Sequence, residues 1–499
     1  MLALGDAARR GDGRDLPRDA LGSAALGMAR AREAGEPVKD TQTLAGIASR
    51  FLMKVGPNRG RVHVVGAGLA GLAAAVRLAA EGYAVRLYEA GNHAGGRCRS
   101  YFDAELGCRI DNGNHLLLAG NHAALDYLER IGALATLDGP PHAAFPFIDA
   151  VTKQRWTLRP NRGVLPWWIL RAKTRIPETR AIDYLAIMAL RHAEAFARVA
   201  EILDTEQSLF HRLWEPLVVA ALNTSAEHAS ATLFCRILTE TLGRGGTACR
   251  PLVPRDGLSE TFVGPALAYL RAEGAEVRFR ARLRALEFGQ DRILELMFDT
   301  GSIGLDGDDI VILAVPAAIA SRLVPALTVP DAHSPIVNAH FRCKSPPGAP
   351  LLVGVIGGAA EWIFRKREAL SVTVSAADRI VDRTAPELCD LFWRDVALAY
   401  RLPTHPVPPV RIVKERRATF LASPEQLKRR PGTKTGWKNL LLAGDYVDTG
   451  LPATIEGAIR SGFSAARQVL ARQHDAAAER RSSDRCFSAG MGLPEEHIQ

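Results

Sequence analysis

The clearest pattern of apolar and polar positions lies between residues 62 and 90. Val62 to Val65 contains three valines in four residues, which is typical of a buried strand in a parallel sheet. Leu72 to Ala80 consists mainly of small and apolar residues and predicts a helix, and Ala84 to Tyr88 predicts a second strand. A strand, a helix and a strand in this order predict a βαβ unit and a parallel sheet.

The turn before the predicted helix carries Gly66, Gly68 and Gly71 in the spacing GxGxxG. The first glycine permits a tight turn, the second lets the backbone approach a pyrophosphate, and the third lets helix and strand pack closely. The N–H groups of Leu69 and Ala70 at the helix start suit an anion. This turn therefore predicts a dinucleotide site, and the alternative is an ordinary βαβ turn.

Glu89 ends the second strand, where its carboxylate can accept hydrogen bonds from ribose hydroxyls and would repel a 2′-phosphate. Gly95, Gly96 and Arg97 follow a few residues later. The two glycines let this loop fold over phosphates, and a guanidinium can bond phosphate oxygens. The alternative for this triplet is a plain surface turn.

The rest of the chain predicts an α/β protein with a second, mixed-sheet and helical domain. The predicted helices are His122–Ile131, Ile182–Leu203, Ser208–Leu222, Ala229–Leu242, Pro386–Tyr400, and one that begins within Pro452–Glu456 and ends near Arg472. The predicted strands are Val277–Leu286, Asp309–Val315, Leu351–Ile356, Ser371–Ser375 and Leu440–Ala443.

The predicted domains are discontinuous. Residues 61–140, 250–330 and 435–473 form the Rossmann-like nucleotide domain, and 141–249 and 331–434 form the substrate domain, with a helical lid. Residues 1–60 lack the core pattern and are predicted to be disordered or not native, with Met53 as a candidate start. Residues 474–499 are predicted to be a disordered tail.

The order GxGxxG, acid, GGR resembles the glutathione-reductase-like flavoproteins of the amine oxidase and phytoene desaturase superfamily, which implies FAD. Four longer strings resemble the hydroxysqualene dehydroxylases: IDNGNHLLLAGN, WEPLVVAALNT, GLSETFVGPALAYL and LAGDYVDTGLPATIEGAIRSG. This resemblance covers residues 61–472 and implies reduction of hydroxysqualene to squalene in hopanoid synthesis. One departure is Arg365-Lys366-Arg367, where an acidic residue is expected.

The resemblance also implies roles for individual residues. Asp111 or His115 is expected to supply or relay a proton beside the flavin, and the alternative is that both hold a turn. The remaining expected FAD contacts are Leu283 at the adenine, Gly444 and Asp445 near the ribityl chain or pyrophosphate, and Thr454 and Ile455 at a helix start facing the flavin. Residues 439–462 contain no cysteine, so we expect non-covalent FAD.

Composition narrows the location and the partners. The formal net charge is +9, but no nucleic-acid motif accompanies it, so lipid or plain solubility is preferred to nucleic acid. The seven cysteines lack a CxxC pair, which favours reduced thiols in the cytoplasm over a metal site. Trp167 and Trp168 lie among five Arg or Lys residues within 159–177 and predict contact with the inner face of the cytoplasmic membrane; the alternative is a packed helix.

Two questions stay open at this point. A carotenoid desaturase of the phytoene type and an amine oxidase are the alternative activities, although an aromatic content of 6% disfavours the aromatic cage of an amine oxidase. The chain has no second GxGxxG, so the reductant is either transiently bound NAD(P)H or a partner reductase.

Overall fold

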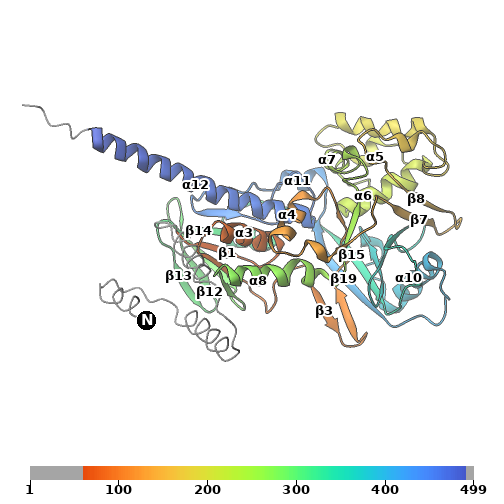
Figure 1. Cartoon of the computed structure of the whole chain (residues 1–499), viewed down its shortest axis with the longest axis horizontal. Helices are drawn as coiled ribbons and strands as arrows, with labels where there is room; N and C mark the ends of the chain where they lie inside the picture. Colours follow the sequence, from red (N-terminus) through yellow and green to blue (C-terminus); the bar gives the residue numbers. More distant parts are fainter. Residues whose placement is uncertain (1–59, 490–499) are drawn as a thin grey trace, which may run out of the picture. The chain divides into compact units, whose positions relative to one another are not determined.

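The computed structural model describes the backbone of residues 60–489 and the side chains up to Arg472 (Figure 1). The predictions for residues 1–59, including the start at Met53, lie outside the described residues, as do those for 490–499. None of the helices in the described part combines the length and apolar character that crossing a membrane requires.

The predicted βαβ unit forms the middle of a five-stranded parallel sheet. Its strand order is β10-β2-β1-β14-β20. The strands are β1 (Val62–Val65), β2 (Val85–Tyr88), β10 (Glu276–Arg278), β14 (Ile310–Leu313) and β20 (Leu440–Leu442). The strand predictions at these places are confirmed within two residues at each end, except at residues 277–286.

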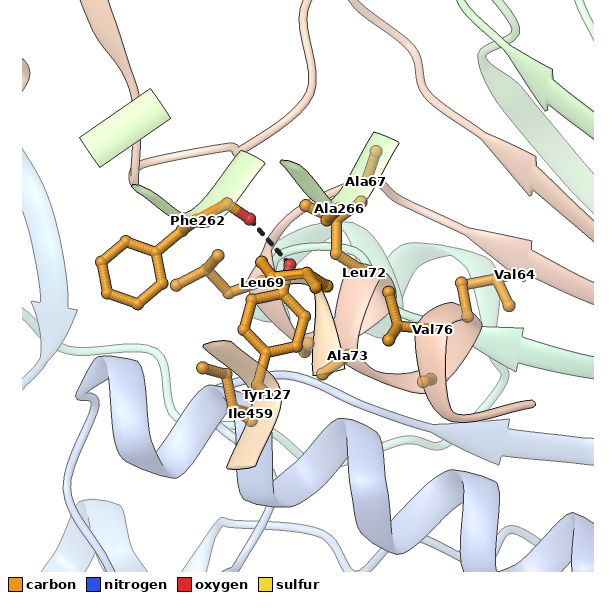
Figure 2. Close-up of a cluster of buried hydrophobic side chains, with 14 of the residues drawn as sticks. Val64, Ala67, Leu69, Leu72, Ala73, Val76, Tyr127, Phe262, Ala266 and Ile459 are labelled. Atoms are coloured by element: carbon orange, nitrogen blue, oxygen red, sulfur yellow. Dashed lines mark hydrogen bonds between the residues drawn. The ribbon is translucent and has the colours of Figure 1, made fainter. Parts of the chain in front are cut away.

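Two helices pack closely beside this sheet. Helix α3 (Leu69–Ala80) is almost wholly buried, and α12 (Ile455–Ala489) lies against it. Gly462 of α12 permits this approach, because a Cβ there would overlap the carbonyl of Ala70. Figure 2 shows Ile459 of α12 among the core side chains, with the Tyr127 hydroxyl donating to the carbonyl of Phe262. The dinucleotide turn therefore stands on a tightly packed base.

A seven-stranded sheet lies in the segments predicted for the substrate domain. Its order is β19-β15-β18-β17-β16-β7-β8. The strands are β7 (Phe145–Asp149), β8 (Arg155–Leu158), β15 (His333–Phe341), β16 (Leu352–Ile356), β17 (Trp362–Arg365), β18 (Leu370–Val374) and β19 (Val410–Phe420). Val337, Val372 and Phe341 pack against α10 (Ala385–Tyr400) in one apolar cluster.

The remaining elements complete the fold. The further strands are β3 (Ser100–Asp103), β4 (Cys108–Asp111), β5 (Leu117–Leu118), β6 (Leu137–Asp138), β9 (Pro251–Pro254), β11 (Leu283–Phe288), β12 (Ile293–Phe298) and β13 (Gly301–Gly304). The further helices are α4 (His122–Arg130), η2 (Leu134–Thr136), η6 (Leu242–Arg244), η7 (Ser259–Val263), α8 (Gly264–Ala272), α9 (Ala317–Leu323), η8 (Ala377–Arg379) and α11 (Pro424–Lys428).

The long helix predicted over Ile182–Leu203 is wrong. The structure has the 3₁₀ helix η4 (Ala181–His192) and the single turn α5 (Val199–Ile202). Around α5 the N–H groups of Val199 and Ala200 donate to the carbonyls of Ala229 and Ala226 instead of continuing a helical ladder. Hydrogen bonds to another segment thus overrode the amphipathic pattern.

The other helices of this insert follow the prediction more closely. The structure has η3 (Trp167–Ile169), η5 (Phe210–Trp214), α6 (Glu215–Leu222) and α7 (Ala231–Glu240). Strands β7 and β8 were not predicted; they join this stretch of chain to the seven-stranded sheet.

Two boundaries were also wrong. The strand predicted over Val277–Leu286 is broken into β10 and β11, which belong to different sheets, and Arg280 between them has a φ of 55°. Helix α12 continues to Ala489 instead of ending near Arg472. The sequence after His474 is polar, but residues 475–489 are rich in Ala and Arg, which favour a helix.

Candidate active site

The glycine-rich turn has the geometry that a dinucleotide needs. Gly66 has a φ of 106°, and a Cβ there would overlap the carbonyl of Ala314. At Gly68 an added Cβ would meet no atom within 4 Å, so the space in front of this residue is open. No side chain caps the start of α3, which leaves the N–H groups of Leu69 and Ala70 available to an anion. At Gly71 a Cβ would overlap the carbonyl of Gly66, so the third glycine serves packing.

Glu89 is tied to the same turn. Its Oε2 accepts a hydrogen bond from the N–H of Ala67 at 3.0 Å, and its Oε1 accepts one from the N–H of Gly91 at 2.8 Å. Each carboxylate oxygen keeps a free lone pair, so the group can still accept hydrogen bonds from ribose hydroxyls.

The GGR loop folds back onto the turn. The N–H of Gly95 donates to the carbonyl of Ala67 at 2.7 Å, and Gly95 also bridges to Gly68. Gly96 has a φ of 59°, and a Cβ there would lie 3.5 Å from the Cα of Gly68. The structure thus places the two predicted glycine motifs side by side.

Arg97 and Asp445 form an ion pair although 348 positions separate them in sequence (445 minus 97). The guanidinium lies 2.7 Å from Asp445 Oδ2, and the Arg97 side chain remains 46% exposed. Gly444, before Asp445, donates its N–H to the hydroxyl of Ser461 on α12 at 2.8 Å. The loop after β20 is therefore joined both to the GGR loop and to α12.

Thr454 is the N-cap of α12. Its hydroxyl accepts a hydrogen bond from the N–H of Gly457 at 3.0 Å, and Ile455 behind it is buried in the core. Arg430, which sequence reasoning did not identify, also holds the loop after β20. Its buried guanidinium donates to the carbonyls of Asp445, Tyr446 and Val447. Nothing in the local pattern distinguishes Arg430 from the basic residues around it.

Leu283 is the residue predicted to contact the adenine. Leu283 opens β11, where it pairs with Phe298 and packs in an apolar cluster. The backbone beside Glu89 belongs instead to Arg278 and Ala281: the Glu89 N–H donates to the Arg278 carbonyl at 2.8 Å, and the Ala281 N–H donates to the Glu89 carbonyl at 2.9 Å.

Asp111 is held as a buried carboxylate. Its Oδ2 lies 2.9 Å from the ammonium of Lys366, and its Oδ1 accepts hydrogen bonds from the Ser100 hydroxyl at 2.7 Å and from the Leu258 N–H at 2.9 Å. Burial alone would raise the pKa of Asp111, but Lys366 and these hydrogen bonds outweigh it and lower the pKa. Asp111 is thus an acceptor at neutral pH. Lys366 comes from the basic triplet noted as a departure from the family.

His115 combines strong desolvation with partial exposure. Burial lowers the pKa of His115 to about 4, and the charges of Asp111, Lys366 and Arg97 also act on it. Its ring forms no hydrogen bond with the residues that the structure describes, and it is only half-buried. At neutral pH the imidazole is uncharged.

A chain of polar side chains joins the 111–115 loop to the seven-stranded sheet. The Asn114 amide donates to the Thr373 hydroxyl at 3.0 Å, which donates to Asn338 Oδ1 at 2.8 Å. The Asn114 Oδ1 atom is buried without a partner among the described residues. Buried polar atoms of this kind need an explanation, and a bound polar group is one. Nothing in the local sequence around these three residues indicates that they meet.

The two tryptophans of the predicted membrane contact differ in exposure. Trp167 is 60% exposed, but Trp168 is 8% exposed and packs edge-on against Tyr184 at 5.3 Å between ring centroids. The prediction that Trp168 faces a membrane is therefore wrong, because that indole belongs to the apolar core.

Together the glycine turn, Glu89 and Arg97 fit a dinucleotide, because they provide open space, free N–H groups, a carboxylate and a guanidinium at one sheet edge. The six described cysteines are free thiols, and no group of residues in the described part has the arrangement of a metal site. The candidate site consists of the dinucleotide turn and of the side chains around residues 111–115.

Comparison with known proteins places the chain in a family. Residues 69–470 match the family model described as flavin containing amine oxidoreductase. The hydroxysqualene dehydroxylase of Rhodopseudomonas palustris is 49% identical over 411 residues, which is 82% of this chain and 98% of that protein. That of Zymomonas mobilis is 44% identical over 408 residues, with the same two shares.

More distant similarities agree with this fold. A 15-cis-phytoene desaturase of Arabidopsis thaliana is 22% identical over 480 residues, 82% of this chain and 80% of that protein. The structure of cyclohexylamine oxidase from Brevibacterium oxydans matches with a TM-score of 0.61 at 16% identity, covering 84% of this chain and 100% of that one.

Proposed function

This chain belongs to the flavin-containing amine oxidoreductase family and to its hydroxysqualene dehydroxylases, and on that premise we propose that it reduces hydroxysqualene to squalene with electrons from non-covalent FAD. The observation that carries this proposal is 44–49% identity over 98% of the length of three such relatives. The phytoene-type desaturase is supported less well, because its similarity is 22%.

We assign the FAD contacts to the residues that meet at the edge of the five-stranded sheet. The glycine turn and the start of α3 bind the pyrophosphate, and Glu89 binds a ribose. The proposed set is Gly66, Gly68, Leu69, Ala70, Gly71, Glu89, Gly95, Gly96, Arg97, Gly444, Asp445, Thr454 and Ile455. Near the adenine we replace Leu283 by the backbone of Arg278 to Ala281, because this backbone lies beside Glu89.

The reaction replaces an allylic C–OH by C–H. Bound reduced FAD supplies the hydride. Asp111 and Lys366 hold the loop that carries His115, and the uncharged His115 can hydrogen-bond the substrate hydroxyl without repelling a developing positive charge. Departure of the hydroxyl as water requires a proton as well.

The direct test is a single-turnover reaction of purified protein with reduced FAD and hydroxysqualene under anaerobic conditions. We expect squalene by mass spectrometry and one equivalent of oxidised flavin. In D₂O the hydrogen on the flavin nitrogen exchanges, so squalene should gain one deuterium. Desaturation of phytoene, or peroxide formed from an amine, with no squalene from hydroxysqualene, would replace this function by one of the two alternatives.

We further propose that the protein works at the inner face of the cytoplasmic membrane, in hopanoid synthesis. A thirty-carbon polyene favours a bilayer over water by roughly 20 kcal/mol, at about 0.8 kcal/mol per carbon. Eight large apolar side chains within residues 164–196 are exposed: Val164, Leu165, Trp167, Leu170, Ile182, Leu185, Met188 and Phe196. The exposed Arg171 and Lys173 lie in the same stretch, the exposed Arg159 and Arg162 come shortly before it, and all four suit anionic headgroups.

Liposome co-sedimentation tests this surface. The double substitution Trp167→Ser with Leu170→Ser should weaken binding to vesicles that contain an anionic lipid by roughly a hundredfold, because it removes about 3 kcal/mol of apolar insertion. The matched control is Phe102→Ser, since Phe102 is 64% exposed but lies outside this stretch. Equal binding of the double variant and the control would place the contact elsewhere. The reductant can be identified by adding NAD(P)H or a partner reductase in turn to the hydroxysqualene assay and measuring which of them supports repeated turnover.

A further inference from the structure

The proposed reaction needs a proton donor, and neither predicted residue carries an acidic proton at neutral pH. Asp111 is ionised in its pair with Lys366, and His115 is uncharged. Another acid is therefore required, and one is bonded just beyond the strand that carries Thr373 of the polar chain of Asn114, Thr373 and Asn338.

Glu361 occupies such a position. It directly precedes Trp362, which opens β17 and is paired with Thr373 on β18. The Oε2 atom of Glu361 accepts a hydrogen bond from the N–H of Ser375 at 2.7 Å. Ser375 lies two residues beyond Thr373, so this hydrogen bond ties the carboxyl group to the end of β18, near the polar chain.

The second oxygen of Glu361 is available. Oε1 forms no hydrogen bond with the residues that the structure describes, and the side chain is half-buried. Trp362, the next residue, belongs to the apolar cluster that also holds Trp214 and Phe364. The carboxyl group of Glu361, with one anchored and one unoccupied oxygen, thus lies at the end of the strand whose Thr373 bonds Asn114.

We propose that Glu361 is the acid that protonates the leaving hydroxyl, a role that rests on the proposed function. Its carboxyl gives H⁺ to the hydroxyl oxygen, the C–O bond breaks with both electrons going to oxygen, and water leaves. Reduced FAD, when bound, would supply the hydride with its two electrons to this carbon, so carbon would be reduced and flavin oxidised. The Glu361 carboxylate regains its proton from solvent.

The electrostatic surroundings agree with this role. Burial raises the pKa of Glu361 to about 8; the Ser375 N–H and the charge of Arg379 on η8 lower it, and the charge of Glu215 on α6 raises it. The group is therefore mostly protonated at pH 7, which a general acid must be.

The first test compares Glu361→Gln with wild type in the FAD-loaded protein. Loss of the proton should lower kcat for squalene formation by roughly 10²–10³-fold while KM and FAD affinity stay unchanged. Glu361→Asp should recover part of the loss. Wild-type activity should be present below the pKa of about 8 and fall as pH rises through it. Wild-type turnover by Glu361→Gln would overturn the assignment.

A second readout does not depend on turnover. Infrared difference spectra of wild type minus Glu361→Gln at pH 7 should contain a protonated carboxyl C=O band that shifts in D₂O and titrates away as pH rises. Glu215→Gln removes a like charge, so the same band should titrate at a lower pH. Absence of the band at pH 7 would refute the protonated state and with it the proposal.

These outcomes distinguish a failure of the proposed function from a failure of the proposed role of Glu361. If wild type forms no squalene, the proposed function fails, whatever the infrared spectra show. If wild type forms squalene and only the Glu361 results are negative, the function stands and another group is the acid.

Discussion

The edge of the five-stranded sheet and the polar face of the seven-stranded sheet build sites in opposite ways. At the first, the site is formed mainly by backbone N–H groups and glycines, which come from a short segment between Gly66 and Arg97. At the second, side chains from the 111–115 loop, β15, β18 and the turn after β17 meet, and almost every hydrogen bond joins positions more than 30 apart.

This difference determines how each site responds to change. A site made of backbone depends on conformation, so it tolerates most side-chain replacements and fails when a Cβ enters a closed turn. A site made of buried side chains depends on partners, so removal of one leaves another unpaired in a medium of low dielectric constant.

The strongest contrast should come from Lys366→Met. It leaves the Asp111 carboxylate buried without its cation, and we expect a loss of about 3 kcal/mol in the free energy of unfolding. Urea denaturation measures this, with Arg416→Met as control, because Arg416 and Asp382 are 63% and 78% exposed. The double variant Lys366→Met with Asp111→Asn should recover part of the loss. A surface-like cost below about 1 kcal/mol would contradict the buried pair.

The same pair has a pH dependence of known sign. Because the folded state lowers the pKa of Asp111, its stabilisation is present above the unfolded pKa and is lost as pH falls through the folded one. Stability of wild type relative to Asp111→Asn should therefore decrease only in acid, below about pH 4. An unchanged difference across that range would contradict the ionised state.

At the first site, Gly66→Ala should cost about 2–3 kcal/mol and abolish the bound-flavin absorbance, because φ is 106° and the new Cβ meets the Ala314 carbonyl. Gly274→Ala is the control: its φ is 77°, but its Cβ would meet no atom within 4 Å. For this control we expect a loss of about 1 kcal/mol in the free energy of unfolding and a normal flavin content. Normal flavin content in Gly66→Ala would break the comparison.

Asp445→Asn tests how much a side-chain ion pair contributes to FAD binding at the first site. Loss of the ion pair with Arg97 should weaken FAD binding by roughly tenfold, or about 1.4 kcal/mol. Flavin fluorescence titration measures this affinity. Asp331→Asn breaks an exposed pair with Arg429 and should leave it unchanged. Equal affinities for both variants would mean that backbone alone holds FAD.

The smallest expected effect is that of Thr373→Val. Its hydroxyl links Asn114 to Asn338, so its removal should cost about 1 kcal/mol in unfolding free energy or roughly fivefold in squalene turnover. Thr239→Val is matched, because that hydroxyl bonds only the Cys235 carbonyl of its own helix. Equal stability and turnover of the two variants would mean that the hydrogen bonds of Thr373 with Asn114 and Asn338 are not part of the site.

Much of the fold was readable because local rules govern it. The glycine turn, β1, β2 and α3 follow from periodicity and turn chemistry within 30 residues. Predictions failed where another segment intervened: at α5, whose backbone bonds residues 226 and 229, and at Arg278–Leu283, where the chain leaves one sheet for another. The prediction for Trp168 failed for the same reason. Its indole packs against Tyr184 from another segment, whereas Trp167 beside it in sequence is exposed.

By itself the sequence determined that a dinucleotide turn is present and, through its longer strings, to which family the chain belongs. Only the tertiary structure decided which side chains share a charge or a proton: that Lys366 neutralises Asp111, that Arg97 meets Asp445, and that Glu361 is held without a full partner. The physical reason is range. Turns and periodicity act over a few residues, whereas desolvation and ion pairing depend on distances in space that sequence order does not encode.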